Sequence, residues 1–376
     1  MKLIEFVSHA EGKIRSVAAK LLSPRLFIFL YSATRAPYLK ALKLSGGSLT
    51  GQAEGTPKVL FKNKLTFRND LGNAAGLDKD GSLLGFNYNL GAGFAVVGTV
   101  LSEPHNGNVI CRLCCPLNPW TPLPNSAAAI NSLGLPSKGI DCAVKKIKLF
   151  KERVAPKNFP IGVSIMGHPN HQSDEERLAG IAVCVQKSLE VADFIEINES
   201  CPNTIHDAGA EAMSERIKRV IQIRDGSEKY VPVLVKLADL GDVDHTVRFL
   251  AAHGVDGVVI VNTQKNYDEL VDKVSEKDRE LFEYYTEKFQ GGVSGRAIRD
   301  FSFSQASAAA AAVVAHNLDF VVVHVGGIST PQDMAASRAI NEQCGREVVV
   351  LREWYTGLME AMGEKSWRAV YPQMVK

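Results

Sequence analysis

The sequence of 376 residues has no long hydrophobic run, no disulfide-type cysteine spacing and almost no net charge. The longest apolar stretch near its start, 26–31, lies between Arg25 and Arg35 and is far shorter than the roughly 20 residues that cross a bilayer. A net charge of +2 does not indicate a nucleic-acid partner. With 45% hydrophobic and 22% charged residues, the composition is globular, which excludes a disordered or fibrous protein.

Seven cysteines in a chain of this length do not form a disulfide framework, which indicates a reducing, cytoplasmic compartment unless the chain lies on a membrane. Cys111, Cys114 and Cys115 form one C-x-x-C-C group. No second pair follows at the spacing of a zinc site or an iron–sulfur cluster. We interpret these cysteines as structural and predict no metal.

Positive charge is concentrated at the start of the chain. Residues 1–50 contain eight Lys or Arg and two Glu, a net charge of +6, and the remainder carries −4. We expect two short helices before Gly46-Gly47, with Pro24 and Pro37 as breaks. Their interleaved apolar and basic residues fit a segment on a membrane surface, a segment packed on the main domain, or a targeting segment. We assign residues 1–47 to this helical cap.

Residues 48–376 read as one α/β domain. After a hairpin expected over 58–68, which would cover the body, helical stretches alternate with short apolar runs that end in polar residues or glycine. Ser173 and Asp242 each supply a helix start. Buried runs alternating with helices predict parallel strands, and eight of them predict a closed TIM barrel rather than an open doubly wound sheet. The runs are 72–76, 94–98, 161–166, 193–198, 233–237, 257–262, 320–325 and 348–351.

Polar residues follow several of these runs, where a barrel carries its functional groups. Asn198, Cys201 and Asn203 come directly after one run. A cysteine there is suited to act as a base or nucleophile, and the amides are suited to a small heterocyclic amide; a turn whose Asn side chains bond their own backbone is the alternative. Lys79 follows a run of small residues and is suited to a substrate carboxylate, with a solvated turn as the alternative.

Lys236 ends a hydrophobic strand, where an ammonium is costly unless it meets an anion or a polarisable ring. Glycine pairs at 291–292 and 326–327, and a helix expected to start near Thr356, have the pattern of a phosphate cradle. Together these features predict a phosphorylated planar cofactor and a small carboxylated substrate.

With these motifs in this order, residues from about Phe61 to the C-terminus resemble the dihydroorotate dehydrogenase family, flavin mononucleotide (FMN) enzymes of pyrimidine biosynthesis. The resemblance rests on 74–79, 131–135, 198–203, Lys236, 262–263, 291–295, 326–327 and 355–356. It implies oxidation of dihydroorotate to orotate. Cys201 would remove the proton from carbon five while carbon six delivers a hydride to FMN, and Lys236 would stabilise the negative charge of the reduced flavin.

The resemblance also implies a set of binding residues. Lys79, grouped with Cys201 as catalytic, would bind substrate together with Asn131, Ser132, Leu133, Gly134, Leu135, Asn198, Asn203, Asn262 and Thr263. FMN would contact Ala75, Gly76, Thr99, Ser164, Asn198, Lys236, Val261, Gly295, Gly326, Gly327, Tyr355 and Thr356.

The chain mixes two classes of this family. Cys201, Ser164 and the 131–135 run resemble the soluble class, whereas the N-terminal extension, 67–69 and the Asp78-Lys79 pair resemble the membrane class, which reduces quinone. Arg112 matches a membrane-class arginine, but Cys115 replaces a second one near the quinone path, and the residues 352–354 are unusually bulky and charged. The sequence therefore leaves quinone and fumarate open as acceptors, together with peripheral membrane contact.

Two other functions remain open at this point. A related dihydropyrimidine oxidoreductase would need an electron-transfer partner, because the chain has no cluster-type cysteine spacing. A catalytically lapsed flavin-binding barrel would bind a partner or a lipid through its basic cap.

Overall fold

The computed structural model describes residues 2–46, 55–62, 64–112, 116–199 and 210–376. Cys114, Cys115, Cys201 and Asn203 lie outside the described residues, so their predicted roles stay predictions.

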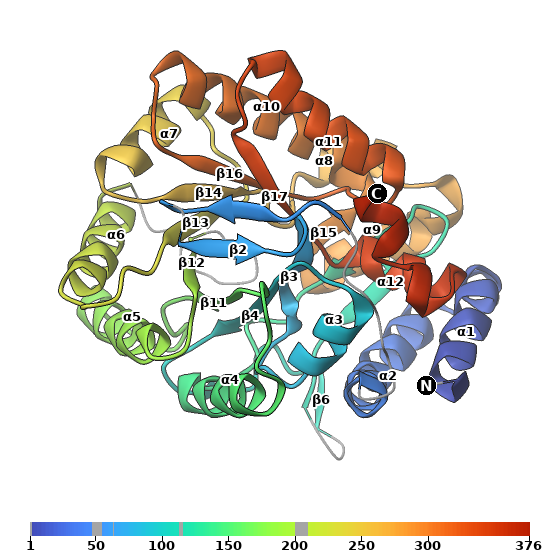
Figure 1. Ribbon diagram of the computed structural model, residues 1–376. Helices are drawn as coiled ribbons and strands as arrows, with labels where there is room; N and C mark the ends of the chain where they lie inside the picture. Colours follow the sequence, from blue (N-terminus) through green and yellow to red (C-terminus); the bar gives the residue numbers. More distant parts are fainter. Residues whose placement is uncertain (1, 47–54, 63, 113–115, 200–209) are drawn as a thin grey trace.

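Eight parallel strands close into a barrel, seen end-on in Figure 1. This confirms the predicted fold and excludes the open sheet. β17 continues three residues beyond the run predicted for it, so Arg352, Glu353 and Trp354 belong to the strand rather than to the loop after it. In barrel order the strands are β11 (Ile161–Ile165), β12 (Phe194–Asn198), β13 (Val233–Leu237), β14 (Gly257–Ile260), β16 (Val321–Val325), β17 (Val349–Trp354), β3 (Leu71–Asp78) and β4 (Ala95–Val100).

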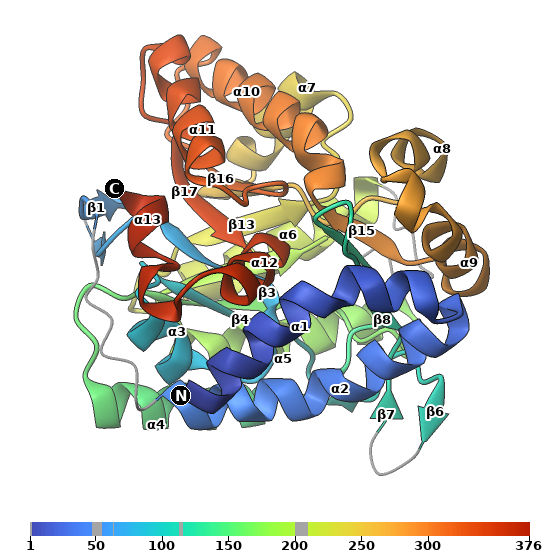
Figure 2. The same cartoon turned by 90° about the vertical axis from the view of Figure 1, so that its right-hand side faces the viewer.

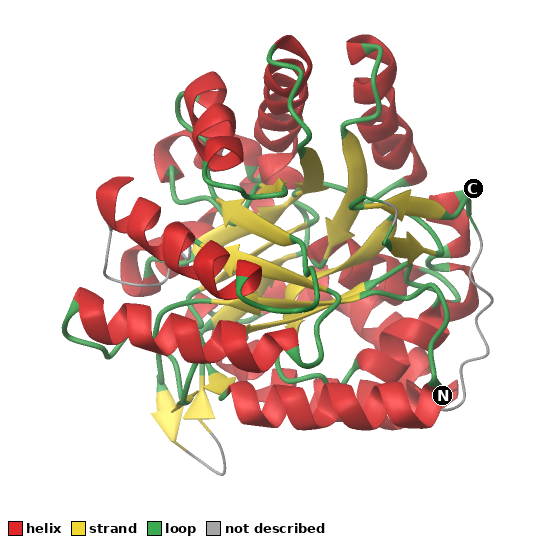
Figure 3. Ribbon diagram, turned by 60° about the vertical axis from the view of Figure 1, so that its left-hand side comes forward, coloured by secondary structure: helices red, strands yellow, loops and turns green. Residues whose placement is uncertain are grey.

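Helices surround the strands, as the colouring in Figure 3 shows. The predicted helix starts are confirmed: the Ser173 hydroxyl accepts from the Glu176 N–H at 3.1 Å, and Asp242 accepts from the His245 N–H at 3.0 Å. The helices are α3 (Leu84–Leu90), α4 (Ile140–Val154), α5 (Asp174–Leu189), α6 (Ala210–Asp225), α7 (Val243–Ala252), α8 (Tyr267–Leu270), α9 (Arg279–Phe289), α10 (Arg299–Ala315), α11 (Pro331–Cys344), α12 (Thr356–Glu364) and α13 (Pro372–Val375).

The strands alternate between side chains that fill the barrel and side chains that face the helices. Phe94 and Phe194 belong to the interior cluster. The hairpin of β1 (Lys58–Leu60) and β2 (Leu65–Phe67) covers this cluster, because Phe67 packs on Phe94 with ring centroids 5.5 Å apart. Gly162 has no room for a side chain, since a Cβ there would lie 2.3 Å from the Phe194 ring.

The cap consists of α1 (Lys2–Leu21) and α2 (Pro24–Ser45), which run side by side along one flank of the barrel (Figure 2). The expected break at Pro37 is wrong: α2 continues through it and is longer than expected. The helix loses one backbone hydrogen bond there, because proline has no N–H. Gly12 of α1 meets Gly363 of α12, where a Cβ on Gly12 would lie 2.8 Å from the Gly363 carbonyl oxygen.

Short strands add smaller sheets beside the barrel. β15 (Gly292–Gly295) pairs antiparallel with β9 (Ala128–Asn131), which also pairs with β8 (Trp120–Leu123). This pairing places Asn131 opposite Gly292, a contact that the sequence did not predict. Two further antiparallel pairs are β5 (Pro104–His105) with β10 (Ser137–Lys138) and β6 (Cys111–Arg112) with β7 (Pro116–Leu117).

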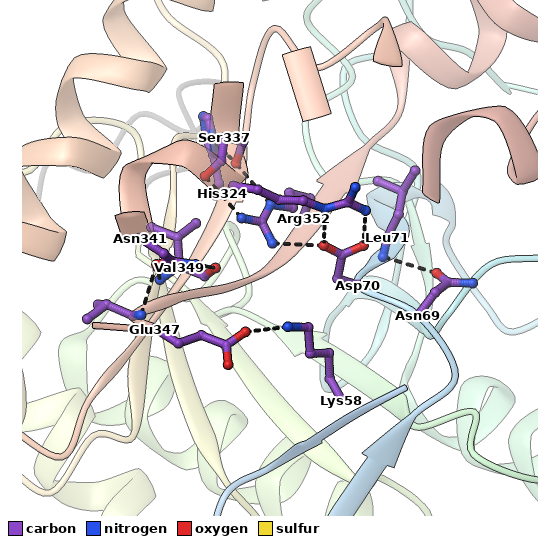
Figure 4. Close-up of polar contacts among 12 residues, drawn as sticks. Lys58, Asn69, Asp70, Leu71, His324, Ser337, Asn341, Glu347, Val349 and Arg352 are labelled. Atoms are coloured by element: carbon purple, nitrogen blue, oxygen red, sulfur yellow. Dashed lines mark hydrogen bonds and ion pairs between the residues drawn. The ribbon is translucent and has the colours of Figure 1, made fainter. Parts of the chain in front are cut away.

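A buried polar network lies between the barrel wall and α11 (Figure 4). The Arg352 guanidinium contacts Asp70 at 2.9 Å and donates to the Ser337 hydroxyl at 2.9 Å. The Ser337 hydroxyl contacts His324 Nδ1 at 2.8 Å, and His324 Nε2 lies 3.3 Å from the Ser302 hydroxyl, which donates to the Gly326 carbonyl at 2.6 Å. The network thus links the closing strands of the barrel to the loop after β16.

This network makes stability depend on pH. Burial, followed by the charges of Arg352 and Arg299, lowers the pKa of His324 to about 3. The unfolded chain binds this proton below about pH 6.5, so the free energy of unfolding should fall by about 1.4 kcal/mol per pH unit as the pH drops from there towards 3. In urea unfolding between pH 4 and 8, His324→Gln should remove the part of this slope that the uptake of one proton causes. His245→Gln, an exposed histidine on α7, should retain it; an equal slope in both variants would contradict the assignment.

Candidate functional site

One cavity of about 560 Å³ opens at the carboxyl ends of the barrel strands and continues between α1 and α2. Its volume lies in the roughly 300–1,000 Å³ range of ligand pockets. Predicted site residues that line it are Ala75, Gly76, Lys79, Thr99, Asn131, Leu133, Leu135, Asn198, Lys236, Val261, Asn262, Thr263, Gly295, Gly326, Gly327, Tyr355 and Thr356.

Three predicted residues are placed differently. Ser164 does not line the cavity but supports it, with its hydroxyl 3.2 Å from that of Thr99. Ser132 and Gly134 lie in the same loop as Leu133 and Leu135 without lining the cavity. The Ser132 carbonyl accepts from Asn108 at 3.1 Å, and a Cβ on Gly134 would lie 2.4 Å from the Asn108 side-chain oxygen. These two residues therefore shape the loop rather than line the cavity.

A chain of uncharged polar groups crosses the strand ends. Asn198 donates to the Thr99 hydroxyl at 3.0 Å, and Asn262 donates to the Asn198 side-chain oxygen at 3.3 Å. The Asn262 oxygen in turn accepts the Thr263 backbone N–H at 2.9 Å. Because each amide is oriented by its neighbour, the row offers fixed donors and acceptors to a flat heterocycle.

Lys79 lies in a turn whose other two charges are held in place. Asp78 is buried and accepts the Leu83 N–H at 3.0 Å; burial and then the charge of Asp80 raise the pKa of Asp78 to about 7. Asp80 forms ion pairs with Lys138, at 2.9 Å, and with Lys146. The two acids are buried and bonded, which excludes a solvated turn as their explanation. Lys79 is the member of this turn that lines the cavity.

The loop after β16 and the start of α12 form a backbone cradle. Gly327 has a φ of +72°, and a Cβ there would lie 2.4 Å from Arg299 Cα. Gly357 lets the helix approach the loop, since its Cβ would lie 2.3 Å from the Ile328 carbonyl oxygen. The Ser329 hydroxyl beside it is buried and has no hydrogen-bond partner among the described residues. A helix N-terminus, two close glycines and an unused hydroxyl are suited to a phosphate group.

A charged cluster lies inside the barrel at the base of the cavity. Lys236 Nζ lies 3.3 Å from Glu353 Oε2 and 3.9 Å from Glu196 Oε2. All three residues are at most 3% exposed. Burial opposes the charge of Lys236, but the two carboxylates outweigh it and raise its pKa. Burial and the charge of Glu196 raise the pKa of Glu353 to about 8, against the lowering effect of Lys236.

The far end of the cavity, between the cap helices, is lined by both apolar and polar side chains. Arg15 pairs with Glu360 of α12 at 2.7 Å. Tyr31 donates to Glu11 at 2.5 Å, and burial followed by the charge of Glu11 raises the pKa of Tyr31. Arg35 donates to the Gly76 carbonyl at 3.4 Å.

Sequence reasoning missed this end of the cavity and Glu353 as a cavity-lining residue. The polar residues of the cap recur at helical spacing, Ser8, Glu11 and Arg15 on one helix and Tyr31, Arg35 and Tyr38 on the other. That repeat was a usable signal for two helix faces that share a cavity. Glu353 was noticed only as an unusual charge, because the strand was predicted to end before it.

The described residues fit a planar cofactor with a phosphate. Small residues at 74–76 line one side of the cavity, the cradle lies at its edge, and the buried Lys236 supplies a positive charge at its base. For a flavin, the small residues leave room for the ring, the cradle suits the phosphate, and Lys236 suits the polarisable carbonyl groups of the ring.

Comparisons with known proteins agree with this reading. A family model described as "Dihydroorotate dehydrogenase" matches residues 59–350. Among curated relatives named dihydroorotate dehydrogenase (quinone), that of Stenotrophomonas maltophilia (strain K279a) is 34% identical over 259 residues, 64% of this chain and 69% of the relative. That of Xylella fastidiosa (strain 9a5c) is 33% identical over 228 residues, 57% of this chain and 60% of the relative.

Solved structures share the fold. The ligand-free DHODH of Eimeria tenella matches with a TM-score of 0.70 at 21% sequence identity, covering 89% of this chain and 91% of that chain. The same protein in complex with ferulenol matches with a TM-score of 0.68 at 22% identity, covering 89% and 88%.

Proposed function

The chain belongs to the dihydroorotate dehydrogenase family of oxidoreductases, and from this premise we propose that it oxidises dihydroorotate to orotate with bound FMN. The observation that carries the proposal is the single cavity in which Lys79, the amide row and the phosphate cradle meet. A lapsed barrel would have no reason to retain all three.

When bound, FMN supplies the acceptor for the hydride that leaves carbon six of dihydroorotate. Gly326, Gly327 and the start of α12 would hold its phosphate, and Lys236 would place a positive charge where reduction adds a negative one. Support comes from the cradle geometry and from the buried position of Lys236.

The substrate would lie against the amide row. Asn131, Asn198, Asn262 and Thr263 line the cavity and would bind the pyrimidine ring, while Lys79 would pair with its carboxylate. Cys201, which lies outside the described residues and three positions after Asn198 in the sequence, would accept the proton from carbon five.

We assign quinone rather than fumarate as the electron acceptor. The named relatives are quinone enzymes, and the cavity continues from the flavin site to the cap, past apolar side chains such as Val7, Leu30, Leu39 and Met359. A dicarboxylate would need paired cations, whereas of the two arginines at this end of the cavity Arg15 is already neutralised by Glu360, and Arg35 donates to the Gly76 carbonyl. An apolar ring with carbonyl groups suits this channel better.

Peripheral contact with a membrane would bring such an acceptor to the channel. The exposed apolar residues of α1 include Leu3, Phe6, Ile14, Val17 and Leu21, between 57% and 77% exposed, and lysines lie among them. This pattern is typical of a helix that lies in a membrane interface. Within the described part of the chain, no helix is both long and apolar enough to span a bilayer.

Anaerobic mixing with dihydroorotate tests the reaction. The purified protein should be yellow and should bleach, whereas a colourless preparation that takes up no FMN, or one that does not respond, would contradict the proposal.

Cys201→Ser should retain flavin and lose most turnover at neutral pH, because a serine hydroxyl is a far weaker acid than a thiol. Cys344→Ser, at the end of α11, is the matched control and should turn over normally. Normal turnover of Cys201→Ser would remove its role as base.

Blocking the channel tests the acceptor. Val7 lines the cavity and is 46% exposed, whereas Val17 on the same helix is 57% exposed and does not line it. Val7→Trp should slow reoxidation of the reduced protein by a short-chain quinone at least tenfold and leave its reduction by dihydroorotate unchanged. Val17→Trp should alter neither step. Reoxidation by fumarate as fast as by quinone would overturn the assignment.

Vesicle binding tests the cap. Phe6→Glu with Ile14→Glu should reduce co-sedimentation with anionic phospholipid vesicles at least tenfold, because each charge must be dehydrated in the interface. Leu149→Glu, an exposed leucine on α4, is the control. Equal binding of both variants, or no binding by the unmodified protein, would refute peripheral contact through α1.

A further inference from the structure

The cluster of Lys236, Glu196 and Glu353 has one carboxylate more than its single ammonium can neutralise. Both carboxylates lie within 3.9 Å of Lys236 Nζ, and all three side chains are almost completely buried. Burial of a net negative charge is costly, so the cluster favours a state in which Glu353 holds a proton. The barrel wall thus holds a proton-binding group directly beside the lysine assigned to the flavin.

Glu353 is the acid that faces the cavity. It lines the cavity together with Lys236, whereas Glu196 does not. Its Oε1 is buried without a hydrogen-bond partner among the described residues, and its Oε2 contacts Lys236. The charges that act on it are those of Lys236 on β13 and Glu196 on β12. The side chains that other strands contribute to the interior cluster include Ala74, Val259 and Val325, which carry no charge.

We propose that Glu353 is a proton-accepting residue coupled to reduction of the flavin, an inference that rests on the proposed FMN site. When two electrons and one proton reach the ring, the ring gains a negative charge beside Glu353. Where Glu353 is ionised, its carboxylate then takes up one proton from solvent through the cavity, and an O–H bond forms on Glu353. No other oxidant or reductant is required.

The raised pKa of Glu353 defines where this uptake is measurable. Below about pH 8 the group is protonated before reduction and resembles the neutral amide of glutamine. Above that pH it is ionised in the oxidised protein and must bind a proton or repel the added charge. As the pH rises, the midpoint potential of the flavin should therefore fall more steeply in the unmodified protein than in a protein with glutamine at this position.

Spectroelectrochemical titration of the bound flavin tests this, with Glu353→Gln as the variant. The two midpoint potentials should coincide at pH 6. At pH 9.5 the equilibrium constant for reduction should be at least tenfold smaller in the unmodified protein, which is about 30 mV for a two-electron couple. Identical potentials at both pH values, or a difference that does not change with pH, would overturn the proposal. Glu287→Gln, an exposed glutamate on α9, should behave as the unmodified protein.

Glu196→Gln supplies a second, independent test. Removing its charge leaves Glu353 as the one carboxylate beside Lys236, so Glu353 should ionise at lower pH. The plot of midpoint potential against pH becomes steeper where Glu353 ionises, and this break should therefore move to lower pH. An unmoved break would overturn the proposal, as would loss of flavin from both Glu353→Gln and Glu353→Asp, since Glu353 would then be structural. A protein that binds no FMN at all would instead overturn the proposed function, and the inference with it.

Discussion

The site depends on the seam at which β17 pairs with β3 and closes the barrel. Arg352 donates its backbone N–H to the Asp70 carbonyl at 2.7 Å, and its guanidinium contacts the Asp70 carboxylate. Burial opposes ionisation of Asp70, but Arg338 and Arg352 outweigh it and hold its pKa below the ordinary value. Because alternate residues of a strand face opposite sides, an outward Arg352 requires an inward Glu353. The same register brings Tyr355 over Gly76, where a Cβ would lie 3.7 Å from the ring.

The sequence predicted the features that repeat along the chain and those that follow from local chemistry. Each strand of the barrel overlaps an apolar run of the sequence, and the capping residues Ser173 and Asp242 mark helix starts that the structure confirms. The sequence also predicted the residues around the cavity mouth, because parallel strands bring their carboxyl ends to one edge of the barrel. What remained hidden depends on contacts between segments distant in sequence.

Three particular positions show this limit. The pairing of Asn131 with Gly292 joins two short strands of low regularity, and no periodic signal marks them. Pro37 predicts the end of a helix, but packing of α2 on β8, α3 and α9 outweighs the loss of one hydrogen bond. Glu353 falls outside the strand that the sequence predicts, because an apolar run gives no signal that a strand continues past its first charged residue. Its burial becomes acceptable only beside Lys236, which lies on another strand.

Helix α12 serves two regions at once. Its first residues form part of the cradle, while Glu360 and Gly363 near its other end contact Arg15 and Gly12 of the cap. Nine residues at a rise of about 1.5 Å each make it a strut of roughly 14 Å with a fixed twist. The length of α12 therefore fixes the distance and the angle between the cradle and any surface on which the cap rests. An electron that leaves the barrel towards that surface would travel a distance that this one helix determines.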